Sequence, residues 1–221
     1  MNDLSSFRKS YEKSTLSDSL KNETPFTIFN EWFNDAINDD LIVEPNAMTL
    51  STASQNNKPR NRVVLLKKFN EDGFVFFSNY NSSKGQEIAF NPNVCLSFFW
   101  PSQERQIIIQ GSAKKIPSKE SDDYFYSRPI ESQVGAIVSN QSSVIPNREF
   151  LEKKFIELKK STKIKRPDFW GGYLVNPLRF EFWQGRKNRL HDRIEFIFEN
   201  SLWKNNRLSP CLLYTSDAAD E

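Results

Sequence analysis

Apolar residues first fall into a regular pattern in the segment that follows Thr24 and Pro25. A threonine hydroxyl can cap a helix, and proline suits the first helical position. Apolar side chains then recur with the spacing of one helical face: Phe26, Phe29, Phe33, Ala36 and Ile37. This pattern predicts a helix that packs on the core through that face and ends between residues 39 and 44, before Pro45.

From Ala47 onward the period changes to that of β-strands, in which alternate side chains share a face. Strands are expected over residues 47–54, 61–69, 74–79, 93–100, 105–116, 169–175, 178–184, 189–199 and 201–210. Polar turns at residues 55–57 and 71–73 separate the first three, and such turns join antiparallel neighbours. The apolar run within residues 105–116 predicts a strand buried on both faces.

Helical signals mark four more segments: residues 82–90, 118–127, 130–139 and 148–161. The first of these opens at Ser82 or Ser83, so its free N–H groups and Lys84 offer an anion site, although ordinary capping explains the serines equally well. The order of strands, helical insertion and further strands predicts an α+β protein with a mainly antiparallel, barrel-like sheet.

Composition places the chain among globular proteins. Its 221 residues suit one domain that buries a core without disulfides or metal, and an aromatic content of 14% predicts an aromatic core. No apolar run approaches the roughly 18 to 20 residues that span a bilayer, and the polar first residues lack a signal-peptide core. A cytoplasmic location is therefore expected.

Three parts of the chain are predicted. Residues 1–23 are polar and aperiodic, which indicates a mobile arm, and residues 24–210 form a single domain. Residues 211–221, CLLYTSDAADE, resemble the translation of an adapter used in sequencing libraries. Without this tail Cys95 is the only cysteine, and 30 basic residues face 25 acidic ones, a net charge of +5 instead of +2. A mildly basic chain suits small anions.

Several kinds of chemistry are poorly supported. One histidine and one remaining cysteine cannot assemble a common zinc site, so no metal is expected. The sequence contains no G-x-S-x-G elbow, no G-x-G-x-x-G and no Walker loop, which argues against common hydrolases and nucleotide-binding folds.

The stretch from Phe180 to Arg193 holds the only histidine in the chain. If it is a strand, Arg189, His191 and Arg193 point to the same side, with Trp183 nearby. An unpaired buried charge costs on the order of several kcal/mol, so a buried face of this kind would need an anionic ligand. A solvated surface is the ordinary alternative.

Further cations lie on separate predicted elements: Arg62, Lys67, Lys84 and Arg128. In RVVLLK, alternation places Arg62 and Lys67 on opposite sides of the strand. Two separate phosphate sites would suit a phosphorylated cofactor beside a phosphorylated substrate.

The stretches RVVLLK, ERQIIIQG, YFYSRPIESQVGAIVSNQSS, FWGGY and FEFWQG followed by RLHDR occur in this order. Together they resemble the pyridoxine 5'-phosphate oxidase family, from the FRKSYEK arm to Pro210. The resemblance implies a split β-barrel and a homodimer with FMN at the subunit interface. It also implies oxidation of pyridoxine 5'-phosphate or pyridoxamine 5'-phosphate to pyridoxal 5'-phosphate, with hydride passing from C4' to flavin N5 and dioxygen reoxidising the flavin to give hydrogen peroxide.

The same resemblance implies the site residues. The FMN contacts fall on Arg62, Val63, Val64, Leu65, Leu66, Lys67, Phe77, Ser78, Ser83, Lys84, Gln106, Gln141, Ser142, Trp183 and Arg193. The substrate contacts fall on Arg8, Tyr11, Lys67, Tyr124, Arg128, Ser132, Arg189, Leu190 and His191. Of these, Arg189 and His191 are the catalytic residues, expected to hold and polarise the substrate around C4'.

Two positions depart from the family pattern: Ser83 stands where many members have arginine, and Phe77 where many have tyrosine. Loss of one charge-assisted contact predicts FMN binding weaker by about 1–3 kcal/mol. The alternatives are a flavin- or pyridoxal-phosphate-binding protein without oxidase turnover, a nicotinamide-dependent split-barrel reductase and a nucleic-acid binder. The complete substrate set argues against the first two, and the lysines that follow residue 148 are typical of a solvated helix face rather than a nucleic-acid patch.

Overall fold

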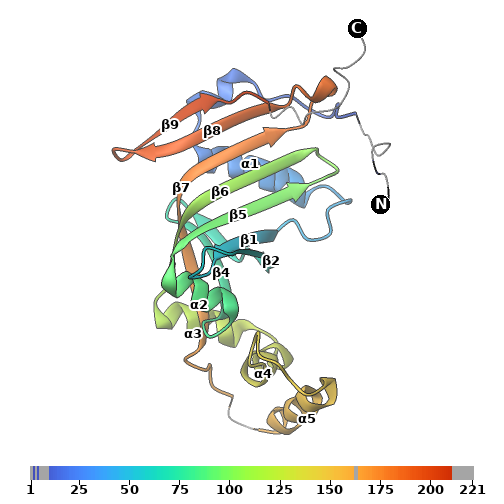
Figure 1. The fold of residues 1–221 in the computed structure, drawn as a ribbon, viewed down its shortest axis with the longest axis vertical. Coiled ribbons are helices and arrows are strands. Elements are labelled where there is room, and N and C mark those ends of the chain that lie inside the picture. The colour runs from blue at the N-terminus through green and yellow to red at the C-terminus, as the bar shows by residue number, and fades with distance from the viewer. Residues whose placement is uncertain (1, 3, 5–9, 162–163, 211–221) are drawn as a thin grey trace. The chain divides into compact units, whose positions relative to one another are not determined.

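The computed structural model describes residues 2, 4, 10–161 and 164–210 of the chain, so the predicted tail and Arg8 lie outside the described residues. The chain separates into two compact units, one formed by Met1–Asn46, Ser97–Ile109 and Leu178–Glu221, the other by Ala47–Leu96 and Gln110–Pro177. Strands β5 (Asn93–Trp100), β6 (Arg105–Lys115) and β7 (Trp170–Gln184) contribute to both units. The elements are labelled in Figure 1.

The second unit, residues 47–96 and 110–177, contains strands β1 (Ala47–Ala53), β2 (Pro59–Leu65), β3 (Lys68–Asn70) and β4 (Gly73–Asn79). Strand β2 pairs antiparallel with β1, placing Val63 opposite Thr49, and β4 pairs antiparallel with both β3 and β7. The antiparallel arrangement predicted from the polar turns is therefore confirmed. The single strand expected over residues 61–69 is wrong, because the chain leaves β1 after Leu65 and pairs with β4 from Lys68.

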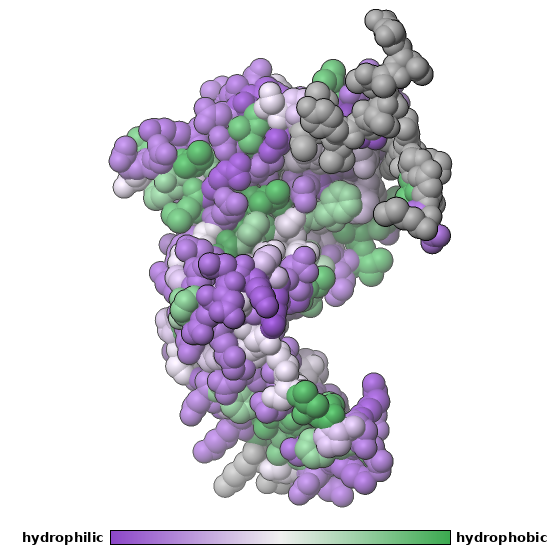
Figure 2. All heavy atoms as spheres, viewed as in Figure 1, coloured by the Kyte–Doolittle hydropathy of each residue, from purple (hydrophilic) through white to green (hydrophobic). Residues whose placement is uncertain are grey.

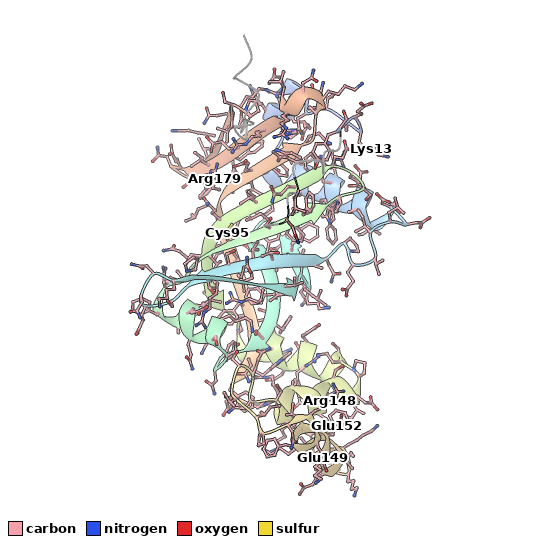
Figure 3. All side chains as sticks on the ribbon, turned by 45° about the vertical axis from the view of Figure 1, so that its right-hand side comes forward. Lys13, Cys95, Arg148, Glu149, Glu152 and Arg179 are labelled. Carbon is pink, nitrogen blue, oxygen red and sulfur yellow. The ribbon has the colours of Figure 1, made fainter. Side chains whose placement is uncertain are left out.

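In the described part of this unit, four helices accompany the strands: α2 (Ser83–Phe90), α3 (Ser118–Ser127), α4 (Ile130–Val138) and α5 (Arg148–Lys159). Each was predicted, and the side chain of Ser82 caps α2 by accepting a hydrogen bond from the N–H of Gly85. On α5, the guanidinium of Arg148 donates to Glu152 at 2.6 Å, and Figure 3 shows both side chains with Glu149 on this helix. The Arg148–Glu152 contact is an i, i+4 ion pair, which is typical of a solvated helix surface.

In the first unit, helix α1 (Pro25–Ile37) lies against one face of the strands (Figure 1). Thr24 caps it and Pro25 opens it, as predicted, but it ends slightly earlier than expected, at Ile37. Edge-to-face ring contacts join it to the sheet: Phe29 to Phe98 at 5.3 Å and Trp32 to Phe182 at 5.4 Å. The predicted aromatic core is thus present, but the buried face of α1 includes Ile28 and Trp32, whereas Ile37, expected on that face, is 54% exposed.

The first unit also contains β8 (Asp192–Glu199), β9 (Leu202–Arg207) and two short 3-10 helices, Asp18–Asn22 and Lys187–Arg189. The strand expected from Arg189 is wrong in its first three residues: Asn188 and Arg189 have left-handed backbone conformations, with φ of 55° and 58°, and β8 starts only at Asp192. Contrary to the expectation, Arg189 and His191 therefore do not share a strand face.

Strand β7 runs unbroken through Pro177, where two separate strands were expected. Antiparallel pairing with β4 covers Trp170 to Val175, and pairing with β8 begins at Arg179. Pro177 lies in the gap between these two partners, so its missing N–H removes no ladder hydrogen bond on that side. The sequence showed the proline but not the change of partner.

Strand β6 corrects the expectation of burial on both faces. Ile107 and Ile109 are fully buried, whereas Ile108 between them is half-buried and Gln110 is exposed. Its apolar run therefore belongs to a strand with one core face and one less buried face.

Hydrophilic residues cover much of the face shown in Figure 2, and hydrophobic ones lie both over the β-strands and around α4 and α5. Exposed apolar side chains in and between these helices include Ile130, Val144 and Ile156. Among the described helices none is long and apolar enough to cross a membrane.

Replacement of Phe29 by alanine is expected to lower the free energy of unfolding by about 3–5 kcal/mol, because it empties a fully buried ring site between α1 and Phe98. Phe90→Ala is the matched control, since that ring is 55% exposed and its loss should change stability by no more than about 0.5 kcal/mol. Urea denaturation of both variants measures the difference, and equal midpoints would contradict the packing described for α1.

Candidate functional site

A cavity of about 1170 Å³ opens in the second unit. It is lined by most of the predicted contacts in that unit: Arg62, Val63, Val64, Leu65, Lys67, Phe77, Ser78, Ser83, Lys84, Tyr124, Arg128, Ser132, Gln141 and Ser142. Leu66 does not line it, because its side chain is buried in the core. The structure thus brings together side chains from β2, β4, α2, the helical insertion and the loop after α4.

Among the described residues, no carboxylate lines this cavity, and five cations do: Arg60, Arg62, Lys67, Lys84 and Arg128. Beneath it, the buried carboxylate of Glu87 pairs with Arg62 at 3.1 Å and with Arg60 at 3.4 Å. For the other three cations, no carboxylate of the described chain lies within 4.0 Å. The cavity therefore carries a net positive charge that suits an anion.

Arg62 is held in place by more than its ion pair. Its guanidinium donates to the carbonyl oxygen of Leu50 at 3.2 Å and to the hydroxyl of Thr52, which in turn donates to Glu87. The sequence prediction missed Glu87, Thr52 and Arg60. The alternation of Arg60 and Arg62 on one strand was the available signal, but it does not reveal the carboxylate that α2 brings to them.

Lys84 lies in the first turn of α2 and is only 8% exposed. Its ammonium donates to the side-chain oxygen of Gln141 at 3.1 Å and to the Ser82 hydroxyl at 3.3 Å. Burial, followed by the charge of Arg62, lowers the pKa of Lys84 to about 8. The N-terminus of α2 packs closely against the preceding chain: a Cβ added at Gly85 would lie 2.1 Å from the carbonyl oxygen of Tyr80, so this position requires glycine.

Arg128 lies between α3 and α4, with its guanidinium 4.9 Å from the centre of the Trp170 ring. Its Nη1 is buried and has no hydrogen-bond partner among the described residues. Burial lowers the pKa of this guanidinium, which nonetheless stays charged. A buried donor of this kind normally has a partner, so the geometry fits an anionic ligand at this point. Tyr124, Arg128 and Ser132 reach the cavity together although Pro129 breaks the helix between them.

Three aromatic rings are nearly parallel in the same region. Phe77 stacks on Tyr124 with ring centres 3.8 Å apart and lies 5.5 Å from Trp170. All three rings line the cavity, so its wall combines flat apolar surfaces with cations. A planar, phosphorylated ligand would match both features.

The remaining predicted residues lie in the first unit. The rings of Tyr11, Trp183 and His191 form a cluster: His191 lies 4.7 Å from Trp183 and 5.7 Å from Tyr11. The Nδ1 atom of His191 accepts a hydrogen bond from the main-chain N–H of Arg186 at 3.1 Å. Burial, and next the charge of Arg189, lower the pKa of His191. The side chains of Arg189 and Leu190 are exposed, and the side-chain amide of Gln106 donates to Ser97.

Arg193 does not present an uncompensated charge. Its guanidinium pairs with the buried carboxylate of Glu181 at 2.7 Å and donates to the carbonyl oxygen of Ser209. Arg179, labelled in Figure 3, binds the same carboxylate at 3.0 Å. At Arg193, the expected need for an anionic ligand is therefore absent, because Glu181 already balances its charge.

Within the described ranges, no group of three or more His, Cys, Asp or Glu is placed to hold a metal ion. The residues described above offer cations, aromatic rings and one imidazole to a ligand.

The fold is that of the split-barrel proteins. A solved structure of PhzG from Burkholderia lata 383, in complex with tetrahydrophenazine-1-carboxylic acid, aligns with a TM-score of 0.83 and 25% identity, covering 90% of this chain and 100% of that one. A pyridoxamine 5'-phosphate oxidase-related, FMN-binding protein from Nostoc punctiforme aligns with a TM-score of 0.69 and 14% identity, covering 85% and 99%.

Sequence comparison shows the family. Residues 34–161 match the model described as pyridoxamine 5'-phosphate oxidase, and residues 170–210 match the model described as the pyridoxine 5'-phosphate oxidase C-terminal dimerisation region. A pyridoxine/pyridoxamine 5'-phosphate oxidase of Flavobacterium johnsoniae is 54% identical, covering 95% of this chain and 100% of its own. The corresponding protein of Leptospira biflexa is 50% identical over the same shares. The chain belongs to the pyridoxine/pyridoxamine 5'-phosphate oxidase family.

The lowered pKa of Lys84 predicts that anion binding weakens at alkaline pH. An anion prefers the ammonium form, which prevails below a pKa of about 8, so sulfate affinity should fall as pH rises through this value, by up to roughly tenfold per pH unit. Sulfate is the probe because it does not titrate in this range, and isothermal titration calorimetry measures its affinity.

Lys84→Arg is the matched control, since a guanidinium keeps its charge and should flatten the pH dependence. A wild-type sulfate affinity that stays constant across pH 8 would contradict the role given to Lys84.

Proposed function

We propose that the chain oxidises pyridoxine 5'-phosphate and pyridoxamine 5'-phosphate to pyridoxal 5'-phosphate, with FMN as its cofactor. The observation that carries the proposal is the cavity of the second unit, in which cations without carboxylate partners lie beside stacked rings. Both ligands of this reaction are planar and phosphorylated, so they match that wall. Membership of the family supports the choice of these ligands over other flat anions.

For the cofactor, the FMN phosphate is assigned to Arg62, Ser83 and Lys84, with Gln141 and Ser142 beside them. Arg62 is held in place by its hydrogen bonds and its ion pair, and Lys84 is buried. Both are suited to this role because a bound phosphate would supply a counter-charge for the buried ammonium. The remaining proposed FMN contacts are Val63, Val64, Leu65, Leu66, Lys67, Phe77, Ser78, Gln106, Trp183 and Arg193.

For the substrate, the phosphate is assigned to Lys67, Tyr124, Arg128 and Ser132, all of which line the cavity. The partnerless Nη1 of Arg128 gives this assignment its physical basis. Arg189 and His191 are proposed to hold the substrate around C4', with Leu190, Tyr11 and Arg8 completing the contacts.

Oxidation of the C4' alcohol removes a hydride from carbon and a proton from oxygen, and no side chain can accept the hydride. When bound, FMN would supply the hydride acceptor, and dioxygen would take up the two electrons as hydrogen peroxide. The part of the chain itself is to bind both phosphates, to hold the substrate ring at near-attack distance and to exclude water.

The active protein is proposed to be a homodimer with FMN at the subunit interface. Support comes from the match of residues 170–210 to a dimerisation region and from the exposed apolar side chains around α4 and α5. A second copy of the chain would cover such side chains.

The test is an absorbance spectrum of the purified protein followed by anaerobic addition of pyridoxine 5'-phosphate. Flavin bands should bleach on addition and return with air, with pyridoxal 5'-phosphate formed. Arg189→Met should reduce turnover far more than FMN affinity, since its guanidinium is assigned to the substrate and not to the cofactor. A flavin-loaded protein that does not bleach would instead favour a binding protein without oxidase turnover.

Ser83→Arg is expected to tighten FMN binding by about 1–3 kcal/mol, or roughly 5- to 150-fold, by adding a charge-assisted contact at the α2 N-terminus. Fluorescence quenching of free FMN on titration with apoprotein measures the affinity. Ser83→Gln is the control of similar reach without charge. An arginine variant that binds FMN no better than the glutamine variant would refute the placement of the phosphate at Ser83.

A further inference from the structure

The loop from Gly185 to His191 connects β7 to β8 and is tightly closed. At its start, the N–H of Gly185 donates to the carbonyl oxygen of Glu104 at 2.8 Å, and within it the N–H of Leu190 donates to Lys187 at 3.2 Å. The left-handed conformations of Asn188 and Arg189 turn the chain back on itself. This turn brings the imidazole of His191 to the main chain of Arg186, five residues earlier.

The hydrogen bond between these two residues has only one possible direction. A main-chain N–H can donate but not accept, and it lies 3.1 Å from Nδ1 of His191. Nδ1 must therefore present its lone pair, and in a neutral imidazole the single proton then lies on Nε2. If Nδ1 were protonated, its N–H would face the N–H of Arg186, and two donors cannot form a hydrogen bond with each other.

The surroundings disfavour a charged ring as well. Burial, and then the neighbouring guanidinium of Arg189, lower the pKa of His191, and Asp192 opposes them with a smaller effect. The Asp192 carboxylate is already engaged by the guanidinium of Arg186 at 2.9 Å and that of Arg207 at 2.8 Å. It therefore anchors the loop instead of pairing with the imidazole.

The ring is also restricted in its rotation. Trp183 lies on one side at 4.7 Å between ring centres and Tyr11 at 5.7 Å, both tilted or edge-on to the imidazole. A flip of the ring about χ2 would break the hydrogen bond from the Arg186 N–H and disturb the contacts with Trp183 and Tyr11.

We propose that the main-chain N–H of Arg186 fixes His191 as a neutral imidazole protonated on Nε2, so that His191 acts as a hydrogen-bond donor and not as the base of the reaction. This inference rests on the proposed function for the identity of the acceptor, which is an oxygen of the phosphorylated pyridine substrate. Arg186 is a positioning residue, and Asp192 supports it by binding its side chain.

The chain offers a direct test, because His191 is its only histidine. The FMN-loaded protein, produced without a histidine tag and labelled with ¹⁵N-histidine, gives long-range ¹H–¹⁵N correlation spectra in which every histidine signal belongs to His191. Nε2 should resonate as a protonated nitrogen and Nδ1 as an unprotonated one at neutral pH, and the ring should titrate below its ordinary value of 6.5. A ring protonated on Nδ1, an average of both tautomers or an imidazolium at neutral pH would overturn the proposal.

Two variants separate the main chain of Arg186 from its side chain. Arg186→Ala keeps the N–H and should keep the Nε2-protonated tautomer, and a change of tautomer would overturn the proposal. Arg186→Pro removes the N–H and should give a mixture of tautomers. A folded proline variant that still shows only the Nε2-protonated tautomer would also overturn the proposal. Because proline is strained at the φ of −138° found here, the wild-type and alanine spectra decide the matter if this variant does not fold.

The spectra do not depend on turnover. An FMN-loaded protein with the expected tautomer that leaves pyridoxine 5'-phosphate unoxidised would refute the proposed function and leave the state of His191 standing.

Discussion

The site depends on an imbalance of charge in the cavity of the second unit. Five cations line it, and the one carboxylate that pairs with any of them in the described chain, Glu87, is shared by Arg60 and Arg62. Holding Lys84 and Arg128 partly buried without a counter-ion costs free energy that a bound phosphate would return. Burial, followed by the charge of Arg62, lowers the pKa of Lys84, and Nη1 of Arg128 has no hydrogen-bond partner among the described residues. Ligand binding and local stability are therefore linked at this site.

Local patterns predicted most of the fold. The Thr24–Pro25 start of α1, the Ser82 cap of α2 and the strands β1, β4 and β5 follow from capping chemistry and period alone. The errors arise where partners change. Pro177 is tolerated because β7 passes from β4 to β8 around it, and the chain after Leu65 divides between β1 and β4. Such exchanges depend on long-range pairing, which a single sequence does not reveal.

The site was predicted with the same limits. The cations on β2, α2 and the segment between α3 and α4 were identified from the sequence and its family resemblance, and the structure brings them to one cavity. What the sequence could not supply was their counter-charges. Nothing in the sequence pattern indicates that Glu87 pairs with Arg62 or that Glu181 pairs with Arg193. These pairs balance two of the cations, whereas no carboxylate of the described chain pairs with Lys84 or Arg128. The left-handed turn at Asn188 likewise lies outside any strand period.

The most direct test of the account compares the affinities of the apoprotein for FMN and for riboflavin, which differ only in the phosphate. Because its phosphate is assigned to Arg62 and Lys84, FMN should bind at least about 100-fold more tightly than riboflavin, since each charge-assisted contact contributes roughly 1.5–3 kcal/mol. Equal affinities, measured by flavin fluorescence quenching, would show that the phosphate does not engage these cations. The charge imbalance would then not be what organises this site.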